Sequence, residues 1–334
     1  MMNSFRIVRN NLKRSCNRRT SFIINLIIPI IVVVLGIFAN SVSKPSFSIG
    51  TINGDNATSI VKALSQTTGI TVSEASLNTI KIDLITGKYS AVVDFSKSDY
   101  ELFSVKDKKT NSELKQIINR YKTTPAPINI EEIVGTEMSI AERTIAFMVL
   151  FLMITATVTA ALMIKDKNNG TMKRYKYSPQ KLASYVLGNF IYNYLITFLQ
   201  FFISITFMQV IGTNIGISYG NLLITGVWLS GIATAFGTFI SSIFQKEMYA
   251  NLFAAFIALI LSLVGGTFIT YDNMPTLLQK VSIISPLRWF IDITQNMENG
   301  INWFENARQV VALSVMILTL LIAAACINKK QKSF

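Results

Sequence analysis

Long apolar runs without a single charged residue dominate this chain of 334 residues. A helix needs about 20 such residues to cross a lipid bilayer. Hydrophobic residues make up 51% of the chain and charged residues only 15%, a balance unsuited to a soluble protein. The uncharged runs occupy residues 20–43, 144–164, 182–245, 248–271 and 309–328. They predict an α-helical polytopic membrane protein.

The run at 182–245 is far too long for one helix. Gly-Thr-Asn-Ile-Gly-Ile-Ser-Tyr-Gly at residues 212–220 forms a natural loop that divides it. The first run exceeds the apolar region of a cleaved signal peptide, about 7–15 residues, so we favour a retained anchor over the alternative of cleavage. Six transmembrane helices result, at residues 21–42, 141–164, 183–211, 221–244, 248–271 and 308–328.

Charges beside these spans predict the orientation. Residues 1–20 hold six basic residues and no acid, residues 165–182 hold six basic residues and one acid, and residues 329–334 are also basic. By contrast, residues 43–140 hold eleven basic and eleven acidic residues, and residues 272–307 are acidic on balance. The positive-inside rule therefore places both termini and the 165–182 loop in the cytoplasm of a multi-pass protein of a cell membrane, which we expect to be a bacterial plasma membrane.

The predicted external segment 43–140 alternates strand and helix patterns around turn residues. This alternation predicts a small extracytoplasmic α/β domain between the first and second spans. Strands are expected at residues 47–52, 70–72, 89–95 and 100–105, and helices at residues 57–64, 77–85 and 112–121.

The sequence lacks residues that several kinds of chemistry require. The sequence has no histidine and no Gly-x-x-x-x-Gly-Lys-[Ser/Thr] loop for nucleotide phosphates, and the predicted spans carry no charged residue away from their ends. We therefore expect no enzyme activity, no metal and no cofactor in this chain. The basic excess flanks the spans, which argues against nucleic acid as a partner. A channel, a receptor, or a transport subunit powered by another protein remains.

The 165–182 loop carries the most specific pattern. An acid, three residues, Gly-Thr, two residues, Arg, three residues and Ser-Pro follow one another. This order resembles the coupling-helix loop of type 2 ATP-binding-cassette (ABC) exporter permeases, in which the acid is commonly Glu. The resemblance implies contact with a cytoplasmic ABC ATPase subunit. The residues that it implicates here are Asp166, Gly170, Thr171, Lys173, Arg174, Ser178 and Pro179.

The N-terminal segment 1–20 interleaves apolar residues with Arg6 and Arg9, which suits an amphipathic helix in the inner membrane interface. It resembles the connecting helix that touches the ATPase in this family, and the resemblance adds Arg6 and Arg9 to the coupling residues. Binding of anionic lipid by a polybasic arm is an equally good interpretation.

A second resemblance follows the fifth span. These permeases carry paired small residues at the outer end of that span, then short re-entrant helices, then Ser-Pro and an aromatic residue before the sixth span. An ordinary interfacial loop is the alternative. The external gate residues that the resemblance implies are Gly265, Gly266, Phe268, Pro286, Arg288 and Trp289.

The resemblance also implies an assembly. Two permease subunits, as a homodimer or a heterodimer, would face each other in the lipid bilayer above two ATPase copies, which bind ATP and Mg²⁺. The second and fifth spans would line the cavity. The candidate pathway residues are Phe147, Phe151, Thr155, Asn251, Phe253, Phe256 and Ile260.

Two other patterns favour packing. Asn189 and Asn193 lie one turn apart in the third span, and we expect hydrogen bonds between helices there. Small residues in the fourth span, Gly231 and Gly237 among them, predict close helix approach.

An uncharged, aromatic-rich cavity suits a hydrophobic or amphiphilic substrate, such as a drug, an antibiotic or a peptide toxin, exported at the expense of ATP. The alternative function is a membrane sensor or immunity protein. Its external domain would bind a ligand, and its ATPase-docking loop would serve signalling.

Overall fold

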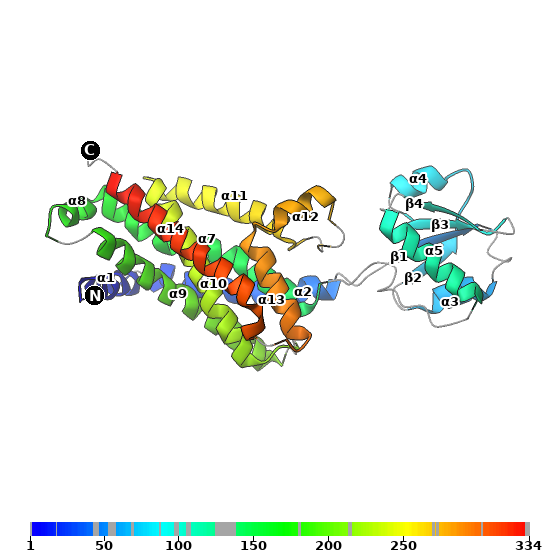
Figure 1. The fold of residues 1–334 in the computed structure, drawn as a ribbon, viewed down its shortest axis with the longest axis horizontal. Coiled ribbons are helices and arrows are strands. Elements are labelled where there is room, and N and C mark those ends of the chain that lie inside the picture. Colours follow the sequence, from blue (N-terminus) through cyan, green and yellow to red (C-terminus); the bar gives the residue numbers. More distant parts are fainter. Residues whose placement is uncertain are drawn as a thin grey trace. The chain divides into compact units, whose positions relative to one another are not determined.

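The computed structural model describes residues 2–17, 19–42, 47–52, 58–67, 70–86, 88–96, 100–104, 108–123, 138–179, 182–212, 216–268, 271, 274–301 and 303–330. The chain divides into two compact units (Figure 1). We call Met1–Asn40 with Ser139–Phe334 the membrane unit, and Ser41–Met138 the α/β unit.

The α/β unit is built on a four-stranded sheet in the order β2-β1-β3-β4. Strand β1 runs parallel to β2 and β3, and β4 is antiparallel to β3. Each element overlaps a range for which the sequence predicts that structure. The elements are β1 (Phe47–Ile52), α3 (Thr58–Gln66), β2 (Ile70–Glu74), α4 (Ile80–Ile85), β3 (Ala91–Asp94), β4 (Glu101–Ser104) and α5 (Lys108–Thr123).

Both faces of this sheet are covered. On one face, Leu64 of α3 and Leu114 of α5 pack in the same fully buried cluster as Val93 of β3. On the other face, Ile80 of α4 packs with Val92. Successive strand residues point to opposite faces, so a strand buried on both sides reads as a continuous apolar run.

The membrane unit consists of helices. They are α1 (Met2–Cys16), α2 (Arg19–Val42), α7 (Ile140–Asn168), α8 (Thr171–Lys176), α9 (Leu182–Ile211), α10 (Tyr219–Ile243), α11 (Glu247–Gly265), α12 (Thr276–Ser282), α13 (Pro286–Glu298), the 3₁₀ helix η3 (Trp303–Asn306) and α14 (Ala307–Lys330). Among the described residues, five helices are long and apolar enough to cross a membrane: α7, α9, α10, α11 and α14. In α2 the described apolar stretch, Phe22–Gly36, is shorter than the length required, so a sixth span at 21–42 stays a prediction.

Helix α7 is the centre of this unit, and α10 packs closely along it. Met153 and Ala156 of α7 are fully buried in the same cluster as Ile232 and Ala233 of α10. A Cβ atom on Gly237 would lie 2.7 Å from the carbonyl carbon of Ala156. Small residues let helix backbones approach in this way, which confirms the packing predicted for the fourth span.

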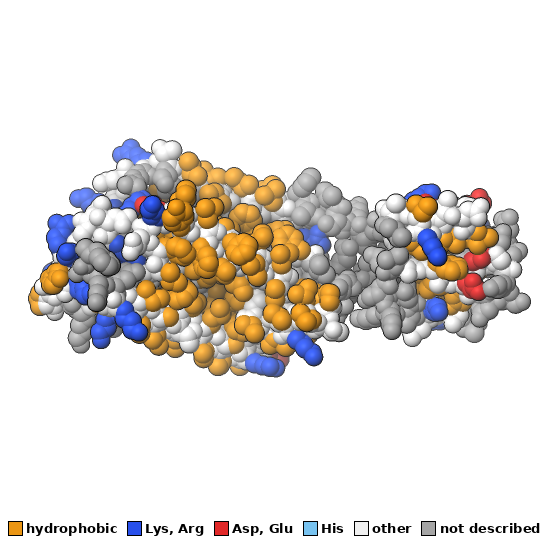
Figure 2. Space-filling model, turned by 90° about the horizontal axis from the view of Figure 1, so that it is seen from above, with side chains coloured by type: hydrophobic (Ala, Val, Ile, Leu, Met, Phe, Trp, Pro, Cys, Tyr) orange, Lys and Arg blue, Asp and Glu red, His pale blue; other side chains and the backbone are white. Residues whose placement is uncertain are grey.

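Apolar side chains cover the outside of the membrane unit. In Figure 2 they spread over its middle, and Lys and Arg side chains gather near the end that carries α8. Exposed examples are Leu252 and Phe256 of α11 and Val315 and Leu318 of α14. A contiguous exposed apolar surface marks contact with membrane or another protein.

The helices differ from the predicted ranges in two places. Helix α7 continues past residue 164 to Asn168, so the segment 165–182, predicted as a coupling loop or helix, contains the last turn of α7, then α8 and the start of α9. Helix α11 does not reach residue 271. It ends at Gly265, because Gly266 adopts the left-handed φ of 102° that terminates helices.

Candidate functional site

Helix α8 follows α7 after a sharp turn at Gly170. This glycine has a φ of 70°, a conformation that other residues seldom adopt, and no atom lies within 4 Å of the position that its Cβ would take. The turn leads directly into the first turn of α8, where the Arg174 Nη2 donates a 3.4 Å hydrogen bond to the Thr171 Oγ1. Glycine is thus required by the backbone and not by crowding.

One face of α8 is seated on the membrane unit. Met172 is buried in a cluster with Tyr185 and Val186 of α9 and Ala324 of α14. The ring of Tyr175 lies 5.4 Å from that of Tyr185.

The other face of α8 is exposed and basic. The exposed side chains are those of Lys173, Arg174 and Lys176. Ser178 closes the segment by donating a 2.6 Å hydrogen bond to the carbonyl oxygen of Tyr175, and Pro179 is exposed. The arrangement presents a fixed basic helix at the end of the membrane unit, which we call the α8 end.

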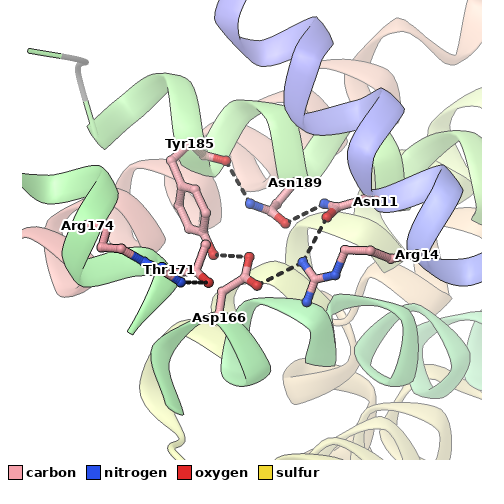
Figure 3. Close-up of polar contacts among 7 residues, drawn as sticks. All are labelled: Asn11, Arg14, Asp166, Thr171, Arg174, Tyr185 and Asn189. Carbon is pink, nitrogen blue, oxygen red and sulfur yellow. Dashed lines mark hydrogen bonds and ion pairs between the residues drawn. The ribbon is translucent and has the colours of Figure 1, made fainter. Parts of the chain in front are cut away.

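A polar network beneath α8 joins α1, α7 and α9 (Figure 3). The Asp166 carboxylate lies 2.8 Å from the Arg14 Nη1 and accepts a 3.1 Å hydrogen bond from the Tyr185 hydroxyl. Arg14 also donates to the Asn11 Oδ1 at 3.3 Å. The Asn11 Nδ2 donates to the Asn189 Oδ1 at 2.8 Å, and the Asn189 Nδ2 donates to the Tyr185 carbonyl at 2.9 Å. The chain therefore satisfies these buried polar groups internally.

This network corrects the expectation for Asp166. The sequence placed it in a loop, available to an ATPase, but it lies in the last turn of α7 with a side chain only 6% exposed. Its partner is Arg14 of the same chain. Arg14 was not among the predicted site residues, because in the sequence it is one of several basic residues of the N-terminal segment. Its spacing from Asn11, one turn earlier, was the available signal.

Helix α1 is amphipathic as predicted, but most of its apolar face rests on protein, and Phe5 is exposed. Val8 is buried against Tyr192 and Ile196 of α9. Arg6 and Arg9 are exposed on the opposite face. These two arginines therefore remain on the surface of the α8 end.

The two asparagines of α9 form the hydrogen bonds between helices that the sequence predicts. Asn189 binds Asn11 of α1, and the Asn193 Nδ2 donates a 2.9 Å hydrogen bond to the carbonyl oxygen of Ala156 in α7. Both side chains are buried. Amide groups in an apolar setting need such partners.

The pathway candidates of α7 point to different neighbours. The Thr155 hydroxyl is buried and donates a 3.3 Å hydrogen bond to the Gln200 Oε1 of α9. Phe147 meets the ring of Phe268 edge to face, with ring centroids 5.9 Å apart. Phe151 is half-buried against the main core. Thr155 thus has a structural partner within the chain.

The pathway candidates of α11 are mostly exposed. Phe256 is 61% exposed, and Phe253 and Ile260 are exposed as well. Phe253 also contacts Phe244, with ring centroids 5.2 Å apart. Asn251 is half-buried. Phe253, Phe256 and Ile260 form one apolar face of α11, and Asn251 lies on the opposite side of the helix.

The predicted gate residues gather at the opposite end, which we call the α13 end. Gly265 is buried, and a Cβ atom there would lie 2.7 Å from the Leu287 Cβ and 2.8 Å from the Ser285 Oγ. Ser285 in turn donates a 2.9 Å hydrogen bond to the carbonyl oxygen of Leu261. Pro286 follows as the first residue of α13. The end of α11 and the start of α13 are therefore in direct contact.

Arg288 and Trp289 complete this end. The Arg288 guanidinium lies 2.6 Å from the Asp292 carboxylate and 4.2 Å from the centroid of the Tyr271 ring. Burial raises the pKa of the Asp292 carboxyl, and Arg288 opposes that shift. The Trp289 indole donates a 2.9 Å hydrogen bond to the carbonyl oxygen of Ile283.

We expect Gly265→Ala to destabilise the α13 end. The added methyl group must displace Leu287 or Ser285, and overpacking of this kind costs about 1–3 kcal/mol. The measurement is the melting temperature of the detergent-solubilised protein. Gly300→Ala is an unsuitable control because Gly300 has a φ of 78°, so Gly220→Ala, with no atom within 4 Å, serves instead. Equal melting temperatures for both variants would contradict the contact.

The fold and site define a class: a polytopic helical membrane protein with a short basic helix fixed at one end of its bundle. The family model described as ABC-2 family transporter protein matches residues 19–326, and the chain belongs to that family. Comparison with curated proteins gave no match. The membership confirms the family expected from the loop and gate patterns. It gives the chain the role of a permease, a membrane transport component that works with a partner ATPase subunit.

Proposed function

We propose that the chain is the permease subunit of an ABC exporter, and that α8 is the surface on which the ATPase subunit docks. One observation carries this proposal. Met172 anchors α8 on α9 and α14, while Lys173 and Arg174 stay exposed. A helix that is packed on one side and basic on the other can bind an acidic groove. When the bound subunit moves, such a helix moves with it as a rigid element.

The distribution of charge supports a cytoplasmic α8 end. The basic side chains of α1 and α8 lie together there, as the positive-inside rule requires of an inner surface. With that orientation, the α/β unit is extracytoplasmic. ATP binding by the partner then favours one arrangement of the helices over another, and alternation between the two moves the substrate outward.

The exposed face of α11 supports a hydrophobic or amphiphilic substrate. Leu252, Phe256 and Ile260 offer apolar contacts without charge. A second permease, identical or different, would face this surface in the assembly and enclose a cavity with it. Two ATPase copies would then serve the two α8 helices.

Copurification of the ATPase subunit with variants of α8 tests this proposal. We expect Arg174→Glu to reduce copurification of the ATPase by about tenfold, since one charge reversal replaces attraction with repulsion at the rim. High salt should weaken the parent complex in the same direction. Gly170→Leu should reduce docking as well, because a φ of 70° costs a side-chain-bearing residue about 1–2 kcal/mol.

The matched control is Lys329→Glu, which reverses a charge on an exposed residue at the end of α14. All variants are compared at equal membrane abundance. Should Arg174→Glu and Gly170→Leu both copurify the ATPase as fully as Lys329→Glu, α8 is not the docking surface, and the proposal is wrong.

A further inference from the structure

The last turn of α7 also forms hydrogen bonds with the end of α10 and with the turn that joins α10 to α11. Lys167 is half-buried there, and its ammonium group donates to the carbonyl oxygens of Ser241 at 2.9 Å, Ser242 at 2.7 Å and Phe244 at 3.5 Å. An ammonium group has three hydrogens to donate. All three of these contacts go to the end of one neighbouring helix.

The chemistry of this contact is that of a helix C-terminus. The last carbonyl groups of a helix have no N–H group ahead of them, and the aligned peptide dipoles leave partial negative charge there. A basic residue in the last turn of the same helix often supplies the cation. Helix α10 has no basic residue in its last turn. Lys167 supplies that cation from α7, so the contact joins two helices.

Two residues close to Lys167, Asn168 and Lys165, contact the turn and the start of α11. The Asn168 Nδ2 donates a 3.2 Å hydrogen bond to the carbonyl oxygen of Gln245, within the turn. Lys165 lies 3.2 Å from the carboxylate of Glu247, the first residue of α11. Successive helix residues are separated by about 100°, so Asp166 faces the other way, towards α1 and α9.

Together these contacts make the last turn of α7 a junction. On one side lies the network of Asp166, and on the other lies the α10–α11 turn. Beyond it, only Asn169 and Gly170 separate the junction from α8. Lys167 and Asn168 thus connect α8, through the last turn of α7, to the end of α10 and the turn after it, and Lys165 connects it to the start of α11.

We propose that Lys167 is a positioning residue that carries the movement of α8 to α11, so that the helix with the exposed apolar face follows the ATPase. The inference rests on the proposed function of α8 as the docking helix. It assigns to a residue of the predicted basic loop a role in transmission, distinct from docking, because its ammonium group points into the protein.

The experiment follows each helix separately in the complete complex with its ATPase. Cys16 and Cys326, both exposed, are first replaced by Ser. A spin label is then placed at Tyr177, at the end of α8, or at Met248 of α11, two exposed positions. Label mobility is recorded without nucleotide and with Mg²⁺ and the analogue AMP-PNP. The variants are Lys167→Met, Lys167→Arg and the control Lys329→Met.

In the parent complex, both labels should respond to the nucleotide. Lys167→Met should keep the response at residue 177, and its response at residue 248 should fall about tenfold, a size typical of coupling between sites. Lys167→Arg retains the charge and several donors and should restore most of the response. Lys329→Met should behave as the parent.

The outcomes separate the two proposals. A full response at residue 248 in Lys167→Met shows that Lys167 only caps α10, and it overturns the inference while docking stands. The absence of a nucleotide response at residue 177 in the parent overturns the docking proposal, and the inference with it. If Lys167→Met does not accumulate, Asn168→Ala, which removes only the bond to Gln245, should lose part of the response at residue 248, and an unchanged response overturns the inference.

Discussion

Gly237→Val is expected to destabilise the membrane unit more than any other single change considered for this chain. A Cβ atom at this position would lie 2.7 Å from the carbonyl carbon and 2.8 Å from the carbonyl oxygen of Ala156, and 2.8 Å from the backbone nitrogen of Thr157. These are backbone atoms of α7, so no side chain can turn aside to make room. The two helices must separate, which also opens gaps among their neighbours.

Overpacking of a core costs about 1–3 kcal/mol when side chains can adjust, so we expect at least about 3 kcal/mol here. The measurement is the temperature at which half of the solubilised protein has aggregated. Gly220→Val is the matched control, because Gly220 lies in the first turn of the same helix and no atom lies within 4 Å of its Cβ position. Equal transition temperatures for the two variants would show that α7 and α10 are not in close contact.

The second large effect is expected from Asp166→Asn. This change removes the charge that faces Arg14 at 2.8 Å, although the Tyr185 hydroxyl can still donate to the remaining amide oxygen. Loss of one partner of a buried ion pair costs about 3–5 kcal/mol. We expect a cost near the lower value, because the Arg14 side chain is 31% exposed and water can solvate part of its charge.

A double-mutant cycle tests the pair. Arg14→Gln, Asp166→Asn and the double variant are compared by thermal unfolding, and we expect an interaction energy of about 1–3 kcal/mol. The double variant should be more stable than the sum of the single changes predicts, because neither charge is then left alone. Strict additivity would contradict the contact and would return Asp166 to the role of a free acid at the ATPase surface.

The sequence predicts the helices of the membrane unit well because a bilayer requires long uncharged segments. Asn189, Asn193 and Gly237 were also predictable, since amides and small residues inside a span have few uses other than contact between helices. The strands and helices of the α/β unit follow from alternating patterns in the same way.

The partnerships at the α8 end were not predictable from the sequence. Lys167 and Arg14 lie in basic segments, where the positive-inside rule already accounts for a charge. Only the spacing of Arg14 from Asn11 offers a signal, and nothing marks Lys167 as a half-buried donor. Asp166 resembles the acid of a docking loop, and only the extra turn of α7 shows that it points inward. The end of α11 was missed because residues 267–271 after Gly266 are all uncharged, so no charge marks the end of the helix.

The packing of α1 against α9 has a consequence for the synthesis of the chain. Val8 and Leu12 belong to a helix that ends at Cys16, whereas their partners Tyr192 and Ile196 belong to a helix that begins at Leu182. Ribosomes add about 5–20 residues per second, so α1 exists for roughly 10–30 s before its binding surface is complete. During that interval we expect its apolar side to lie on the membrane surface. Its final position is then reached by exchange of lipid for protein.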